Sequence, residues 1–112
     1  MVELQPDRLD AVFHALADPT RRAMLRSLAA EPRSVGDLAA PYRMSLAAAS
    51  KHIKALERAG LVRRQVTGRT HLCRLAPEAL AGADAWLAFY RRFWTDQFDI
   101  LSLLIETDGA PR

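Results

Sequence analysis

The amino-acid sequence predicts a mainly α-helical domain that contains one small antiparallel β-hairpin. Two observations lead to this fold class. Most of the chain places apolar residues three and four positions apart, which is the spacing of amphipathic helices. Residues 61–75 instead alternate between the two sides of an extended chain, and Gly68 with Arg69 interrupts them as a tight turn would. We therefore expect four helices, the hairpin and a fifth helix, all within one domain over residues 1–112.

The first two helices are predicted from apolar spacing and from a break between them. The first, over residues 7–17, is defined by apolar residues at helical spacing: Leu9, Val12, Phe13 and Leu16. Asp18 and Pro19 then favour the start of the second helix, because an aspartate can cap free amides and proline has no amide to leave unpaired. The buried side of this helix, which should end before Pro32, is expected to contain Ala23, Met24 and Leu28.

Residues 18–60 are expected to form a helical core that contains a short helix, a tight connection and a longer helix. Ser34 can cap the short helix, and Pro41 limits its length. The longer helix can begin after Ser45 and end at Gly60, which tolerates a left-handed conformation. At about 100° per residue this helix has an apolar arc and an opposite, largely cationic arc. The apolar arc holds Leu46, Ala49, Ile53 and Leu56, and the cationic arc holds Ala47, Lys51, Lys54 and Arg58. With the hairpin of residues 61–75 as a wing, this order is typical of a winged helix-turn-helix.

Positive charge is concentrated on the longer helix and the hairpin. Residues 43–74 contain eight basic residues and one acidic residue, whereas the rest of the chain contains eight basic and twelve acidic residues. This segment therefore carries +7 and the remainder −4, within an overall charge of +3. Such a module favours binding to the phosphates of double-stranded DNA, because neutralised phosphates release counterions. Two alternatives stay open: the charged arc is only solvated, or it docks on an acidic protein partner.

Length and composition indicate one globular domain, since half of the 112 residues are apolar. The lone cysteine, Cys73, allows no internal disulfide, and no apolar run approaches the roughly 18 residues that a membrane helix needs. We therefore expect a soluble cytoplasmic protein without membrane contact. Catalysis is not expected, because Ser50 and His52 point in different directions on a helix, and His71 with Cys73 lacks an orienting partner.

The last segment, residues 77–106, predicts a long helix that begins near Pro77 and is rich in aromatic residues. It contains six of the eight aromatic residues of the chain: Trp86, Phe89, Tyr90, Phe93, Trp94 and Phe98. Positions 87, 94 and 101 share a seven-residue spacing, which favours pairing with another helix. With the first helix, this segment is expected to form a homodimer interface of Leu9, Val12, Phe13, Trp86, Leu87, Tyr90, Phe93, Trp94 and Leu101. An alternative is that the interface also encloses a pocket for an apolar effector, whose identity the sequence does not indicate.

The segments ALADPTRRAMLRSLA, SVGDLA, MSLAAASKHIKALERAGLVRR and GRTHLCRL follow one another in the chain. Together they resemble the ArsR/SmtB group of bacterial winged helix-turn-helix repressors, over about residues 7–105. The resemblance implies a homodimer that represses transcription by occupying an operator in double-stranded DNA. By position, the recognition-helix residues that would approach DNA are Ser45, Ala47, Ala48, Ser50, Lys51 and His52, and the wing residues are Arg64, Gly68 and Arg69. Lys54 joins them because it lies in the cationic arc.

The start of the longer helix departs from the pattern of this family. Many members place polar residues where this sequence has Leu46 and Ala47, so few polar base contacts are expected there. Small apolar groups can touch thymine methyl groups, and DNA shape can contribute further specificity. His52 lies at the margin of the apolar arc, so it either packs and hydrogen-bonds locally or contacts DNA.

The sequence also lacks the ligands of the family's metal sensors. Those members carry a cysteine motif in the third helix, or acidic and histidine ligands in the last helix. Here the third helix reads SVGDLAAPY, and residues 77–112 contain no histidine. His71 and Cys73 share a strand face, but tetrahedral zinc usually has four ligands. We therefore expect no metal and no other cofactor, and interpret the pair as a partly buried thiol beside a polar edge histidine.

Overall fold

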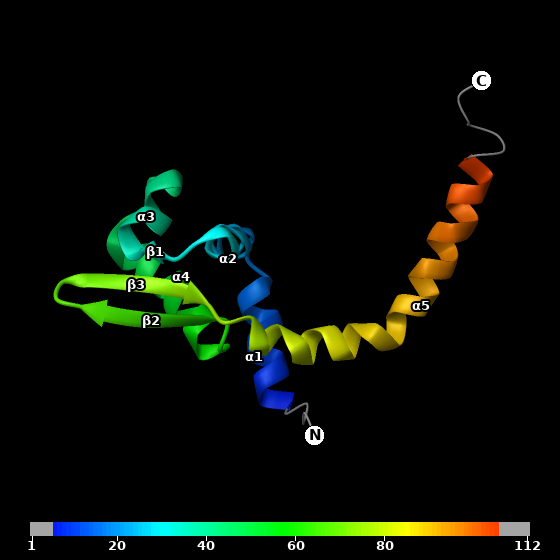
Figure 1. The fold of residues 1–112 in the computed structure, drawn as a ribbon, viewed down its shortest axis with the longest axis horizontal. Coiled ribbons are helices and arrows are strands. Elements are labelled where there is room, and N and C mark those ends of the chain that lie inside the picture. The colour runs from blue at the N-terminus through cyan, green and yellow to red at the C-terminus, as the bar shows by residue number, and fades with distance from the viewer. Residues whose placement is uncertain (1–5, 106–112) are drawn as a thin grey trace.

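The computed structural model describes residues 6–105, and its elements follow the predicted order with one additional strand (Figure 1). The helices are α1 (Pro6–Leu16), α2 (Pro19–Ala30), α3 (Val35–Ala39), α4 (Leu46–Arg58) and α5 (Leu80–Leu104). The strands are β1 (Arg33–Ser34), β2 (Val62–Thr67) and β3 (Thr70–Leu75). Short 3-10 turns at Ala40–Tyr42 and Pro77–Ala79 follow α3 and precede α5. The fold is the expected winged helix-turn-helix, with α3 and α4 as its two motif helices and β2 and β3 as its wing.

Three of the helices begin at the capping residues that the sequence predicted. Asp18, Ser34 and Ser45 each accept a hydrogen bond from the backbone amide three residues later, over 3.0 to 3.1 Å. These bonds satisfy amides that the first turn of a helix leaves free. After α4, Gly60 has a φ of 77°, which confirms the predicted left-handed stop.

The sheet contains a strand that the sequence did not predict. β1 pairs antiparallel with β3, with Arg33 opposite Cys73, so the sheet order is β1-β3-β2. A strand of two residues has no alternating pattern to detect, and only its pairing with β3 reveals it. The wing itself follows the prediction: Thr67 and Thr70 pair across the turn formed by Gly68 and Arg69. Gly68 has a φ of 61°, a conformation that glycine adopts without strain.

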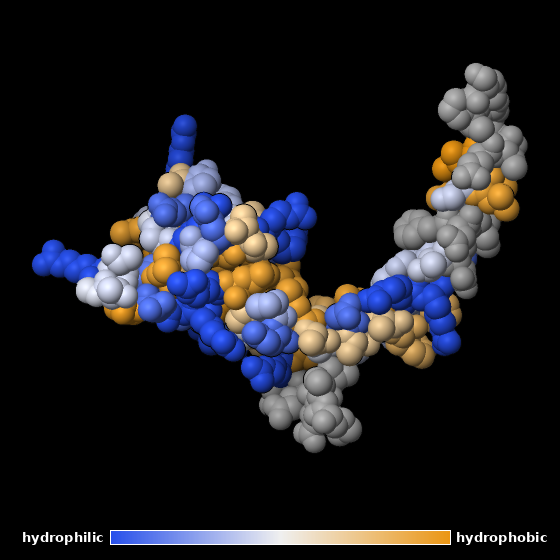
Figure 2. Space-filling model, viewed as in Figure 1, coloured by the Kyte–Doolittle hydropathy of each residue, from blue (hydrophilic) through white to orange (hydrophobic). Residues whose placement is uncertain are grey.

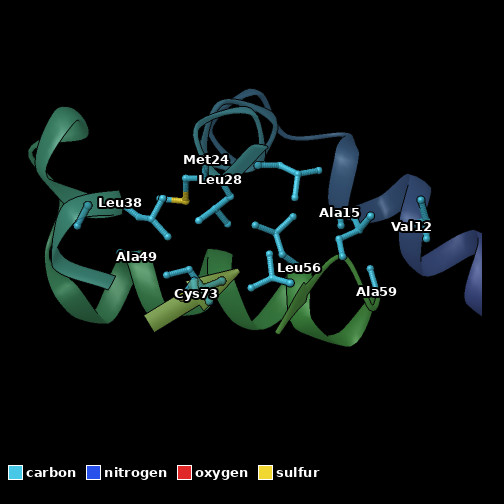
Figure 3. Close-up of a cluster of buried hydrophobic side chains, with 14 of the residues drawn as sticks. Val12, Ala15, Met24, Leu28, Leu38, Ala49, Leu56, Ala59 and Cys73 are labelled. Carbon is cyan, nitrogen blue, oxygen red and sulfur yellow. The ribbon is translucent and has the colours of Figure 1, made fainter. Parts of the chain in front are cut away.

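The hydrophobic core lies between α1, α2, α3, α4 and the sheet (Figure 3). Its largest fully buried side chains are Val12, Met24, Ile53, Leu56, Leu61 and Cys73.

Leu46, predicted on the apolar arc, is instead 62% exposed, because the first turn of α4 extends beyond the core. Ala23 is also exposed, and Leu25 takes the buried position beside Met24. Val12, predicted at the dimer interface, is only 1% exposed and packs in the core of its own chain.

Helix α5 begins against the body of the molecule and then projects away from it (Figure 1). Ala83 is buried, and Trp86 meets Phe13 of α1 edge to face, with 5.6 Å between the ring centroids. The helix starts at Leu80, later than predicted, because Pro77 begins a 3-10 turn instead. Residue 106 of the predicted segment and the side chain of Phe98 lie outside the described part of the chain. Among the described helices, none is both long and apolar enough to cross a membrane.

Candidate nucleic-acid interface

Helix α4 presents the two opposite arcs that its sequence predicted. Ala49, Ile53 and Leu56 are buried against the core. On the other side, the cationic arc is exposed throughout and consists of Ala47, Lys51, Lys54 and Arg58. Ser45 is exposed, and Ala48 and Ser50 are half-buried beside this arc. The fold therefore fixes α4 through its apolar arc and leaves its cations free to meet an anionic surface.

The wing adds an exposed cation next to α4. Gly68 and Arg69 form its exposed turn, and Figure 2 shows hydrophilic side chains that project from the end of the hairpin. A groove of about 430 Å³ separates the wing from the first turns of α4. Leu46 and Ser50 line it on the side of α4, and Arg69, Thr70 and His71 line it on the wing side, while residues 34–36 at the start of α3 close it. Helix and wing thus contribute to one continuous surface.

Arg64, which the sequence placed among the wing cations, turns towards α4 instead of solvent. Its Nη2 donates to a carboxylate oxygen of Glu57 over 2.7 Å, and its Nη1 lies 3.3 Å from Nδ1 of His71. The side chain of Arg64 is only 15% exposed, and its Nε is buried without a hydrogen-bond partner. Arg64 therefore ties the wing to the recognition helix. Sequence reasoning missed this link, although Glu57 is the one acid among the eight cations of residues 43–74.

His52 makes a local contact, one of the two roles left open by the sequence. Its Nδ1 lies 3.4 Å from Nη1 of Arg21, at the start of α2. Arg21 also donates from Nε to the carbonyl of Ala15 over 2.8 Å and from Nη2 to that of His14 over 3.0 Å. One guanidinium thus joins the end of α1, the start of α2 and the side of α4. The two bonds to carbonyl groups hold the end of α1 to the start of α2, and the His52 contact extends this link to α4.

The surroundings of His71 and Cys73 disfavour a metal ion bound through Nδ1 of His71 and the thiolate of Cys73. The Arg64 guanidinium lies 3.3 Å from Nδ1 of His71, where a metal cation would be repelled. Cys73 is fully buried, and burial raises the pKa of its thiol, which disfavours the thiolate that binds metals. Among the residues that the structure describes, no three histidine, cysteine or acidic side chains come together as a possible metal site.

Helix α5 carries a second surface, which is apolar. A hollow of about 500 Å³ runs along it and is lined by Trp86, Leu87, Tyr90, Phe93, Trp94 and Gln97. The four rings are exposed, and Figure 2 shows hydrophobic residues along this helix beside hydrophilic ones. Of the other predicted interface residues, Leu101 is exposed, while Leu9 and Phe13 are partly buried against the core. An apolar surface of this extent is unusual on a monomer and marks a contact surface.

The sequence and the fold are similar to those of known regulators. A helix-turn-helix domain family matches residues 16–65. The HTH-type transcriptional regulator Rv2034 of Mycobacterium tuberculosis is 38% identical over 100 residues, which are 89% of this chain and 91% of that protein.

Solved structures extend this similarity. The crystal structure of an ArsR family transcriptional regulator, RHA00566, is 40% identical with a TM-score of 0.76, and the match covers 85% of this chain and 97% of that one. The homodimeric winged helix-turn-helix DNA-binding domain Mb0332 of Mycobacterium bovis, a possible ArsR-family regulator, is 31% identical. Its TM-score is 0.61, and the match covers 77% of this chain and 80% of that one.

Proposed function

The chain belongs to the ArsR family of winged helix-turn-helix transcriptional regulators, and on this basis we propose that it is a homodimeric repressor of an inverted-repeat operator. The observation that carries the proposal is the exposed cationic arc of α4, which faces away from the core, with the exposed Arg69 of the wing across the adjoining groove. In each protomer α4 enters a major groove, and the wing follows the neighbouring backbone. Repression follows when the bound dimer blocks access of the polymerase to a promoter. Such a repressor acts on the chromosome in the bacterial cytoplasm.

We assign the DNA contacts to two groups of residues. On the recognition helix they are Ser45, Ala47, Ala48, Ser50, Lys51 and Lys54, together with His52 through the ring nitrogen that does not face Arg21. On the wing they are Gly68 and Arg69, while Arg64 holds the wing in place through Glu57. Lysine and arginine bind phosphates and set the affinity, whereas Leu46 and Ala47 supply apolar contacts to base edges.

We propose that a second copy of this chain packs against the apolar surface of α5. Two features support this assignment: the exposed aromatic rings along a projecting helix, and the homodimeric state of the similar domain Mb0332. Phe13 and Trp86 already join α1 to α5, so the pairing surface includes both helices. A two-fold axis between the copies presents two α4 helices to half-sites about 10 base pairs apart, or a multiple of this spacing.

We further propose that this repressor does not use the metal-sensing sites of its family. The Arg64 contact to His71 and the burial of Cys73 support this proposal, as does the lack of histidine in residues 77–112. Zinc should therefore leave its affinity for DNA unchanged. A zinc-dependent loss of DNA binding would refute this part of the proposal.

The operator is found by selection of bound duplexes from a randomised library, followed by footprinting of the purified protein. We expect a two-fold symmetric protected region, and a single asymmetric half-site would refute the dimeric mode of binding. Lys51→Ala and Arg69→Ala should each lower the slope of log affinity against log salt concentration by about one. Arg26→Ala is the matched control, because this exposed cation lies on α2, which packs against the buried side of α4.

The dimer interface is tested by sedimentation of variants without DNA. Phe93→Glu places a charge among the aromatic side chains of α5 and should convert the dimer to monomers. Val66→Glu is the control, because Val66 is as exposed as Phe93 but lies on the wing. A Phe93→Glu protein that stays dimeric would rule out the α5 interface.

A further inference from the structure

The groove between α4 and the wing contains an imidazole to which the proposed function gives no role. His71 lies on β3 beside the turn of the wing and lines this groove together with Ser50, Arg69 and Thr70. Its Nδ1 faces Arg64, and the described part of the chain gives Nε2 no hydrogen-bond partner. Beside the apolar side chains of Val35 and Leu46, the groove therefore offers a ligand three hydroxyls, the guanidinium of Arg69 and one imidazole nitrogen.

The contact with Arg64 decides which nitrogen of His71 carries the proton. A guanidinium only donates, so Nδ1 of His71 must accept at a separation of 3.3 Å. In a neutral imidazole with an accepting Nδ1, the proton is on Nε2, which becomes a hydrogen-bond donor. Arg64 is itself fixed by the 2.7 Å bond to Glu57 of α4. Glu57 and Arg64 thus orient His71 as a donor.

The ligand that suits this arrangement is a phosphate group of the DNA backbone. When α4 lies in a major groove and the wing follows the adjacent backbone, the strand between them passes along this groove. Phosphate oxygens accept hydrogen bonds from hydroxyl, imidazole and guanidinium donors, which are the groups present here. We infer that His71 binds a backbone phosphate through Nε2, and that Glu57 and Arg64 are its positioning residues. This inference rests on the proposed DNA binding and adds a contact to it.

Substitutions of His71 test which nitrogen matters. Asparagine places its amide near the position of Nδ1, whereas the longer glutamine can place a donor near Nε2. His71→Ala and His71→Asn should weaken binding about five- to twenty-fold on every duplex, and His71→Gln should recover most of this loss. Because a neutral donor releases no counterion, the salt slope should stay unchanged, unlike that of Arg69→Ala. Unfolding in urea provides a check that each variant is folded.

A modified operator identifies the partner of His71. Methylphosphonate substitution, which removes the charge of one phosphate at a time, is scanned through each half-site of the selected duplex. At one position the substitution should remove the difference in affinity between the native protein and His71→Ala. In an Arg64→Met background, His71→Ala should cause little further loss, because the imidazole is no longer oriented.

Three results would overturn the inference. The first is that His71→Ala binds the selected duplex as tightly as the native protein does. The second is that His71→Ala lowers the slope of log affinity against log salt concentration. The third is that no methylphosphonate position removes the loss of affinity caused by His71→Ala. Failure of the native protein to bind any selected duplex would instead refute the proposed function. The two failures are therefore distinguishable in the same binding assay.

Discussion

The ion pair between Glu57 and Arg64 should contribute more to stability than any exposed ion pair of the wing. Its charged atoms are 2.7 Å apart, and the two side chains are 31% and 15% exposed. Removal of Glu57 leaves a largely buried guanidinium without its carboxylate. Hydrogen bonds to charged groups contribute about 1.5 to 3 kcal/mol, and the partial exposure of Glu57 favours the lower end of this range. We therefore expect Glu57→Gln to lower the free energy of unfolding by about 1.5 kcal/mol.

A second ion pair on the same strand supplies the matched control. Arg63 and Glu78 are 3.6 Å apart, and their side chains are 75% and 66% exposed. Solvent screens the charges of such a pair, so its coupling energy should be no more than about 0.3 kcal/mol. The difference between the two pairs tests the effect of burial, because each pair joins an arginine of β2 to a glutamate.

Double-mutant cycles measure both coupling energies. One cycle uses Glu57→Gln and Arg64→Met, and the other uses Glu78→Gln and Arg63→Met. Unfolding in urea is followed at one fixed protein concentration, since the stability of a dimer depends on concentration. We expect a coupling of about 1 kcal/mol for the first pair. Equal couplings in both cycles would refute the argument that Arg64 holds the wing against α4.

Three further predictions concern the core, a helix cap and the cysteine. Met24→Ala should lower the free energy of unfolding by about 3 kcal/mol, because Met24 is fully buried, whereas Leu46→Ala, at an exposed position, should change it by less than about 0.5. The hydrogen bond from the Arg21 amide lowers the pKa of Asp18 below its ordinary value of 3.8, so this carboxylate stabilises the fold above that pH and loses its effect as the pH falls through the lowered pKa. Asp18→Asn keeps a capping side chain, and the stability of the native protein relative to this variant should decrease on acidification. The urea midpoints of both proteins are compared at pH 6 and at a pH about three units lower. A difference in midpoint that stays constant over this range would contradict the prediction. Burial raises the pKa of Cys73, so a thiol reagent should label it much faster in denaturant than in buffer, and equal labelling rates would indicate an accessible thiol.

Local signals predicted the parts of the fold that depend on neighbouring residues. The caps at Asp18, Ser34 and Ser45 form because a short polar side chain reaches an amide three residues away. The opposite arcs of α4 follow from the helical repeat, so Lys51 and Lys54 are exposed where the sequence placed them. The assignment of these cations to DNA remains a prediction that the binding experiments address.

Predictions that depended on distant parts of the chain were less accurate. The exposure of Leu46 depends on where the core ends, which the helical repeat does not specify. Val12 was predicted at the dimer interface, but α1 turns it into the core of its own chain. Apolar spacing identifies which residues avoid water, and it cannot distinguish burial within one chain from burial between two.

The order of the helices, the hairpin and the concentration of positive charge on α4 and the wing follow from the amino-acid sequence alone, because each depends on residues close together in the chain. By contrast, the pairing of β1 with β3 and the direction of Arg64 towards Glu57 and His71 depend on the packing of the folded chain. These contacts bring together separate elements, and their geometry depends on how α4 packs against the sheet. For this reason the position of His71 as an oriented donor beside the recognition helix could be found only in the folded molecule.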